Sequence, residues 1–241
     1  MAPVTEPTPA TTVVASLHEA TQRLVRTVDG LSDEEWRAPS LLPGWSRAHA
    51  VAHLVLNAEG LAGALEGLVA GEAVPMYVSP EARDHDIDEL SHDDVHPVRD
   101  RLLASTTRFA DAVAALATEH WAADIERVPG GTRFAAAAVP AMRWREVEIH
   151  HADLGAGYGP HDCEPVFADA VVDTLAARLA DRDPGFTVVL TDAGRSREVG
   201  TVAAGVPEVR GSAADVAWWL SGRGDGEGLT CDGALPEIGA W

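Results

Sequence analysis

Two histidines and a glutamate could together hold a divalent cation. Glu146 and His150 are four residues apart in a helical stretch, and on a helical wheel they lie about 40° from each other. Side chains at this spacing are neighbours, so both could bind one ion. Asp153 lies about 20° from Glu146 on the same wheel. This face also carries the apolar residues expected to be buried, so its polar groups need partners or a cation.

A third ligand must come from another helix. The predicted helix over residues 46–70 offers His49 and His53. His53 lies at the rim of the leucine stripe expected to face inward, and His49 is rotated further out. His53 is therefore the better candidate. The set His53, Glu146 and His150 leaves an open position on zinc for water or a substrate.

These residues also have a plainer interpretation. Glu146 could pair with an arginine, and both histidines could be hydrogen-bonded core residues, since an E-x-x-x-H spacing alone is weak evidence. Asp153 could orient a metal ligand or could simply hydrogen-bond at the helix end. Four further histidines are expected at the surface or in the linker, namely His85, His92, His96 and His161.

Two arginines have a context that suits anion binding. Arg83 follows an apolar approach to a helix start, and Arg223 lies between two glycines after Trp218 and Trp219. A guanidinium can bind a carboxylate through two parallel hydrogen bonds. A surface ion pair is the alternative for either residue.

The hydrophobic periodicity predicts the elements that must position these side chains. An α+β fold is expected: an antiparallel four-helix bundle followed by a small α/β domain, with the boundary at the Gly/Pro-rich residues 155–160. We expect a disordered tail over 1–10, the bundle over 11–160 and the second domain over 161–241. The bundle helices are predicted over 12–29, 46–70, 97–119 and 139–154, with an acidic segment from Ser79-Pro80 to Asp94. The second domain is predicted to contain helices over 165–182 and 212–221 and strands over 186–190, 197–203, 206–210 and 229–231.

Composition limits the possible functions. The chain has 241 residues, 46% of them hydrophobic, and a formal net charge of −20. Such a charge disfavours nucleic acid and anionic lipid as partners, and no apolar run approaches the ~18 residues of a membrane span. There is no lysine, which excludes Schiff-base and phosphate-loop lysines. The two isolated cysteines fit a cytoplasmic protein, for which we expect a monomer.

Four segments resemble, in order and spacing, the mycothiol-dependent maleylpyruvate isomerases of the DinB-like metal-binding four-helix-bundle superfamily. The similarity covers nearly the whole chain, and the segments are LLPGWSRAHAVAHLVLNAEGL, VPMYVSPEARD, RWREVEIHHADLGAG and WWLSGRGDG.

The resemblance implies a site and a reaction. A catalytic zinc would be held by His53, Glu146 and His150, and Arg83 and Arg223 would be functional arginines. Mycothiol would be the thiol cofactor, and the small anionic substrate would be maleylpyruvate, converted to fumarylpyruvate in the gentisate branch of aromatic catabolism. We expect the two arginines to clamp the carboxylates or the enolate of the substrate.

Three rival functions remain open at this point. Another mycothiol-dependent S-transferase of the same fold would consume thiol, whereas an isomerase regenerates it. A non-enzymatic, metal-stabilised binding module would lose stability, but no reaction, when its metal is removed. A water-activating hydrolase would need a general base, either Asp153 or Glu148, and the wheel turns Glu148 away from the ligands.

Overall fold

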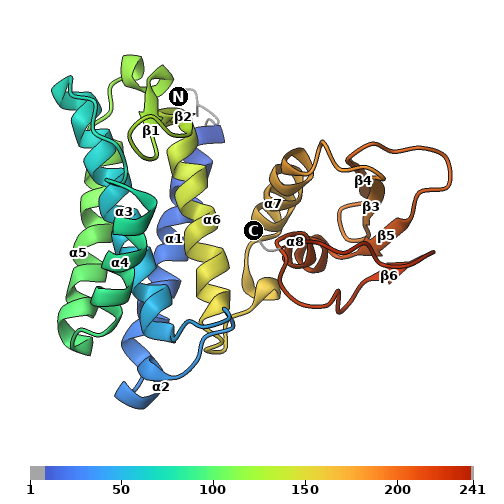
Figure 1. Cartoon of the computed structure of the whole chain (residues 1–241), viewed down its shortest axis with the longest axis horizontal. Coiled ribbons are helices and arrows are strands. Elements are labelled where there is room, and N and C mark those ends of the chain that lie inside the picture. The colour runs from blue at the N-terminus through green and yellow to red at the C-terminus, as the bar shows by residue number, and fades with distance from the viewer. Residues whose placement is uncertain (1–8, 240–241) are drawn as a thin grey trace, which may run out of the picture. The chain divides into compact units, whose positions relative to one another are not determined.

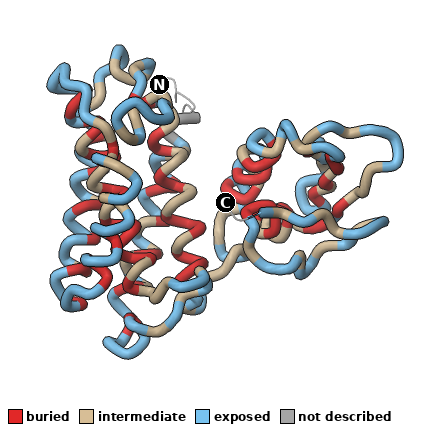
Figure 2. The backbone as a smooth tube through the Cα atoms, in the orientation of Figure 1, coloured by how far each residue is buried: buried red, intermediate tan, exposed pale blue. Residues whose placement is uncertain are grey.

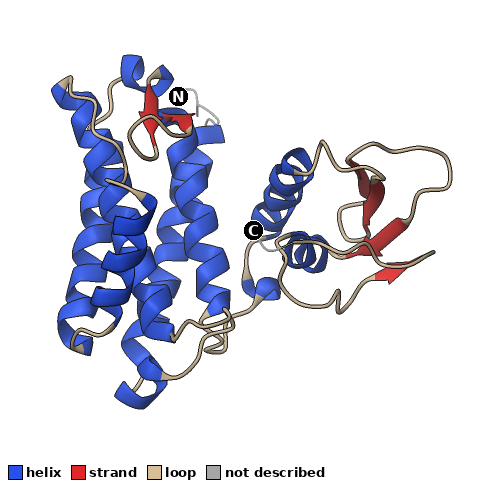
Figure 3. Ribbon diagram, viewed as in Figure 1, coloured by secondary structure: helices blue, strands red, loops and turns tan. Residues whose placement is uncertain are grey.

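The computed structural model describes residues 9–239, which form two compact units, one up to Gly157 and one from Tyr158. A four-helix bundle followed by a smaller unit of helices and strands confirms the predicted α+β fold class (Figure 3). The expected tail over 1–10 lies mostly outside the described residues, and its last two residues begin the first helix. No helix among the described residues is both long and apolar enough to cross a membrane.

The first unit is built on four long helices (Figure 1). They are α1 (Pro9–Gly30), α3 (Arg47–Ala70), α5 (Val95–Ala114) and α6 (Val139–Asp153). Between them lie α2 (Asp33–Arg37), α4 (Pro80–Ser91), the short 3-10 helices η1 (Thr118–Ala122) and η2 (Ala136–Ala138), and the hairpin β1 (Asp124–Glu126) with β2 (Arg133–Ala135). The predicted helix over 97–119 therefore ends earlier, at Ala114.

Local sequence signals set the ends of α3 and α4. The Ser46 side chain accepts a hydrogen bond from the backbone of His49 at the start of α3, and Gly71 ends that helix with a φ of 75°. Ser79 caps α4, and Pro80 occupies its first turn. Serine caps supply an acceptor for free backbone N–H groups, and glycine adopts the left-handed conformation at little cost. These signals were readable in the sequence.

The expected antiparallel order of the bundle is wrong for two helix pairs. Glu59 of α3 pairs with Arg101 of α5, and Glu66 pairs with Arg108. Both helices therefore run in the same direction. The pairs Arg23–Glu148 and Thr27–His151 show the same for α1 and α6. The acidic segment explains the first case, because α4 runs back along the bundle before α5 begins (Figure 1).

The bundle core lies along the inner faces of the long helices (Figure 2). Leu24 of α1, Leu61 of α3 and Leu102 of α5 are almost completely buried. Helix α6 is buried on both sides, because the half of its wheel that carries Trp144, Glu148 and His151 packs against α1. The helix that carries two predicted metal ligands is therefore firmly held.

The second unit contains a four-stranded sheet in the order β4-β3-β5-β6. Its strands are β3 (Phe186–Leu190), β4 (Arg195–Val199), β5 (Glu208–Gly211) and β6 (Thr230–Cys231), and its helices are η3 (Pro160–Asp162), α7 (Pro165–Arg178) and α8 (Ala213–Leu220). Strands β3 and β5 are parallel, and the other pairs are antiparallel. The strand predicted over 197–203 begins earlier, at Arg195, because the turn at Gly194 (φ 63°) closes a tight hairpin with β3.

Candidate metal centre

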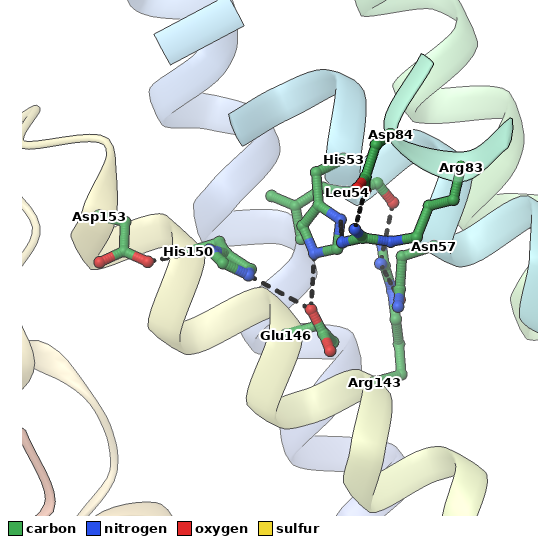
Figure 4. A network of polar contacts seen from close by, with 9 residues as sticks. All are labelled: His53, Leu54, Asn57, Arg83, Asp84, Arg143, Glu146, His150 and Asp153. Carbon is green, nitrogen blue, oxygen red and sulfur yellow. Dashed lines mark hydrogen bonds and ion pairs between the residues drawn. The ribbon is translucent and has the colours of Figure 1, made fainter. Parts of the chain in front are cut away.

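His53, Glu146 and His150 come together inside the bundle, His53 from α3 and the other two from α6. One ligand atom from each lies within 4.8 Å of the others. The Glu146 Oε2 atom lies 2.8 Å from His53 Nε2 and 3.3 Å from His150 Nε2. The two imidazole rings are edge to face, with their centroids 4.6 Å apart (Figure 4). Both Nε2 atoms thus approach one carboxylate oxygen.

The helix geometry explains this convergence. Glu146 and His150 are one turn apart on α6, and His53 lies on the facing side of α3, next to the fully buried Leu54. His53 is 4% exposed. His49, one turn earlier on α3, instead hydrogen-bonds to Ser46 at the helix start, with 2.7 Å between its Nδ1 and Ser46 Oγ. The structure therefore separates the two histidines of α3 into a buried one and a capping one.

The protonation of the cluster is uneven. Burial lowers the pKa of His53 to about 4, although its hydrogen bond to Glu146 opposes the shift. Burial also acts to lower the pKa of His150, but hydrogen bonds to Asp153 and Glu146 outweigh it and raise the pKa. Burial would raise the pKa of Glu146, and the hydrogen bonds from His150 and His53 hold it well below its ordinary value. The centre is an ionised carboxylate between two imidazoles, a donor set that suits zinc.

Asp153 and Arg83 contact the outer nitrogens of the two imidazoles. Asp153 is 1% exposed, and its Oδ2 lies 2.9 Å from His150 Nδ1. A carboxylate at this place fixes the ring so that Nε2 is free to bind a metal. Arg83 of α4 lies on the other side, with its Nη2 3.1 Å from His53 Nδ1.

Arg83 is held by further contacts. Its Nη1 donates to Asp84 at 2.6 Å, and its guanidinium lies over the Tyr77 ring, 5.7 Å from the centroid. Burial raises the pKa of Tyr77, although Arg83 opposes the shift, so its hydroxyl stays protonated at neutral pH. The structure therefore places a cation and a phenol beside the predicted ligands.

Arg223 lies in the second unit, just after α8. Its guanidinium lies over Trp218, 5.7 Å from the ring centroid, and its Nη1 donates to the Ser221 carbonyl at 3.3 Å. The structure thus leaves its role in the site a prediction. The remaining histidines of the acidic segment behave as expected, since the side chain of His85 is 67% exposed and His92 and His96 are exposed as well.

Sequence reasoning missed three side chains beside the cluster. Arg143 and Asn57 are buried and joined by a hydrogen bond of 2.8 Å, and Tyr77 lies under Arg83. One signal was available, because on the helical wheel Arg143 lies only about 20° from His150. Nothing in the sequence placed Tyr77, which reaches the centre from the segment before α4.

Family models match both parts of the chain. Residues 17–155 match the family described as the mycothiol maleylpyruvate isomerase N-terminal domain, and residues 164–240 match the corresponding C-terminal domain. No match was found among curated proteins.

Solved structures show the same architecture. Crystal structures of the mycothiol-dependent maleylpyruvate isomerase and of a histidine-to-alanine mutant each share 26% identity with the chain, at a TM-score of 0.89, over 97% of this chain and 98% of theirs. YfiT from Bacillus subtilis, described as a probable metal-dependent hydrolase with an unusual four-helix bundle topology, matches at 14% identity and a TM-score of 0.51. The match covers 64% of this chain and 90% of the YfiT chain. At this identity it supports only the bundle fold.

Proposed function

Since the chain belongs to the mycothiol maleylpyruvate isomerase family of enzymes, we propose that it converts maleylpyruvate to fumarylpyruvate with zinc and mycothiol as cofactors. The observation that carries this proposal is the meeting of His53, Glu146 and His150 within 4.8 Å, in a chain that matches both domains of that family. Two imidazoles and one carboxylate leave a coordination position for a further ligand.

The chemistry of the reaction calls for a thiolate. A cis double bond cannot rotate until it loses its double-bond character. A thiolate that adds to the conjugated alkene forms a C–S bond, and the alkene electron pair moves to the carbonyl oxygen as an enolate. After rotation about the new single bond, the enolate pair returns, the C–S bond breaks, and the thiolate leaves unchanged. Zinc would supply the thiolate at neutral pH by lowering the pKa of the thiol.

The thiol is proposed to come from outside the chain. The two cysteines, Cys163 and Cys231, both belong to the second unit, and each thiol is directed to a backbone carbonyl, of Pro160 and Ala234 respectively. An external thiol such as mycothiol therefore fits better than an internal nucleophile.

Arg83 is proposed to stabilise the enolate. It can donate to His53 Nδ1 only while the ring proton of His53 is on Nε2, the atom that would bind the metal. With Nε2 coordinated, the ring proton lies on Nδ1, and the guanidinium loses this acceptor. Arg83 is then available for an anionic substrate beside the metal. A fixed cation at a developing negative charge commonly contributes about 10²–10³ in rate.

Asp153 and Arg223 complete the proposed set. Asp153 would keep His150 in the tautomer that binds metal through Nε2. Arg223 is proposed as a second arginine for the substrate carboxylates, on the strength of the family resemblance around its Gly-Arg-Gly motif.

The test is an assay of the purified protein with maleylpyruvate, with and without mycothiol, following the trans product and the free thiol together. We expect trans product only with thiol and zinc, and no net loss of thiol. His53→Ala should abolish turnover, whereas the control His85→Ala, at an exposed histidine of α4, should keep it. Stoichiometric loss of thiol would instead identify an S-transferase. A melting temperature that falls when zinc is removed, with no trans product under any condition, would identify a binding module.

A further inference from the structure

Arg143 is a buried cation that forms no ion pair with any described carboxylate. It lies on α6, one turn before Glu146, and is 1% exposed. Its Nη1 donates to the Leu54 carbonyl at 2.9 Å and to Asn57 Oδ1 at 2.8 Å. Its Nη2 is buried and has no hydrogen-bond partner among the described residues. One edge of the guanidinium is therefore fixed, and the other is left with unused donors.

A buried guanidinium in this state is costly to the fold. Burial lowers the pKa of Arg143 to about 10, with Glu146 opposing, so it remains a cation at neutral pH. A buried charge without a counterion destabilises a protein, and an apolar side chain of similar size would often be better tolerated. Glu146, the nearby carboxylate, already accepts from His53. Packing alone gives no reason for an arginine here.

The Arg143 guanidinium reaches the turn of α3 that carries His53. Arg143 contacts Leu54 and Asn57, and Arg83 contacts His53, so both guanidinium groups meet the same turn of α3. Figure 4 shows Arg143 extending from α6 past Glu146 towards Asn57. Because Asn57 Oδ1 accepts from Arg143, the amide nitrogen of Asn57 remains a donor. The guanidinium groups of Arg143 and Arg83 are like charges in a partly buried place, and they favour the binding of an anion between them.

We propose that Arg143 and Asn57 form a carboxylate-binding subsite next to the metal centre, in which Arg143 Nη2 and the Asn57 amide donate to one carboxylate of the substrate. This inference rests on the proposed function and adds a specificity element to it. The ligand class is a small anion with two acidic groups, one held here and the other nearer Arg83. The subsite would favour such anions over neutral molecules of the same shape.

The test measures binding rather than turnover. Maleate, a small cis dicarboxylate, and maleamide, its neutral diamide, are titrated by calorimetry into the zinc-loaded protein. The wild type is expected to prefer maleate. Arg143→Met, which removes the charge and keeps much of the volume, should weaken maleate binding about tenfold or more and leave maleamide binding and the melting temperature nearly unchanged. Arg101→Met, at an exposed arginine paired with Glu59, is the matched control and should bind maleate normally.

A second variant keeps the proposal testable if Arg143→Met does not fold. Asn57→Asp places a carboxylate against Arg143 and so supplies an internal counterion. We expect this protein to melt at the same or a higher temperature and to lose at least tenfold in maleate affinity. Normal maleate affinity in a folded Arg143→Met or Asn57→Asp protein would overturn the subsite, since Arg143 would then have only a structural role.

The two proposals can fail separately. If the wild type isomerises maleylpyruvate and the variants bind maleate normally, the function stands and the subsite is wrong. If the wild type binds maleate through Arg143 but forms no trans product, the subsite stands and the proposed reaction is wrong. In the active enzyme, Arg143→Lys should raise KM more than it lowers kcat, because the charge is kept while the paired donors are lost.

Discussion

At the scale of single residues, the two histidines of the centre are held in different states by their outer neighbours. His150 Nδ1 faces the carboxylate of Asp153, whereas His53 Nδ1 faces the guanidinium of Arg83. A carboxylate favours a protonated imidazole and a guanidinium disfavours it, which adds to the effect of burial on His53. Asp153 also holds the Nδ1 proton of His150 and leaves Nε2 for a metal, whereas Arg83 must release its contact with Nδ1 before His53 can bind one through Nε2.

Asp153→Asn tests the role of that carboxylate. We expect zinc affinity to fall about tenfold, because the uncharged amide holds the ring of His150 less well. The pKa of His150 in the metal-free protein should fall as well, since the charge and the hydrogen bond of Asp153 both raise it. Competition with a chromophoric chelator measures the affinity, and NMR titration measures the pKa.

Asp94→Asn is the matched control for that experiment. Asp94 precedes α5 and makes no side-chain cap bond there, so its loss should leave zinc affinity unchanged. Equal zinc affinity in the wild type and Asp153→Asn would show that Asp153 only completes a hydrogen bond at the end of the helix.

At the scale of elements, the parallel pairing of α3 and α5 depends on the short α4. Two bidentate ion pairs, Glu59–Arg101 and Glu66–Arg108, join the parallel helices along their exposed sides. Helix α4 also carries Arg83, so the segment that reverses the chain direction delivers a cation to the metal centre. The parallel pairing of α3 and α5 and the position of Arg83 therefore both depend on α4.

Glu66→Gln should remove a small, pH-dependent contribution to the free energy of unfolding. The hydrogen bond from Arg108 holds the pKa of Glu66 below its ordinary value of 4.5. Its stabilising effect is therefore complete above pH 4.5 and is lost as the pH falls through the lower pKa of the folded state. Because both side chains are nearly half exposed, we expect only about 0.5 kcal/mol at neutral pH.

Urea unfolding of the wild type and Glu66→Gln at a series of pH values measures this difference. The two curves should converge in acid. A difference that persists unchanged at low pH would mean that Glu66 stabilises the helix pair through packing and not through its charge.

At the scale of the whole molecule, the predicted zinc ligands all belong to one of the two compact units. His53, Glu146 and His150 lie before Gly157, and the sheet of the second unit contains none of them. A ligand that binds only the folded state stabilises it by mass action, by about 2.7 kcal/mol at a free concentration 100 times the Kd. Zinc should therefore act on the bundle first.

Hydrogen exchange of the full chain tests this expectation. Zinc added without thiol should slow amide exchange in α3 and α6 and leave β3 and β5 unchanged. Glu146→Gln protein, which lacks one predicted ligand, should show little protection at the same zinc concentration. Equal slowing in the sheet of the second unit would contradict a centre confined to the bundle.

The sequence by itself determined the features that depend on local periodicity and local chemistry. The spacing of Glu146 and His150, the inward position of His53 and the serine caps all follow from residues within one or two turns of each other. The fold class and the family were accessible for the same reason, since the motifs are short and contiguous.

Only the tertiary structure decided which helices run parallel, and which buried polar groups meet. The contacts Arg143–Asn57 and Arg23–Glu148 join residues more than 80 positions apart, and each forms through the packing of two helices. A helical wheel gives the face of one helix but not the direction or the register of its partner. That information lies in long-range packing, which local patterns do not encode.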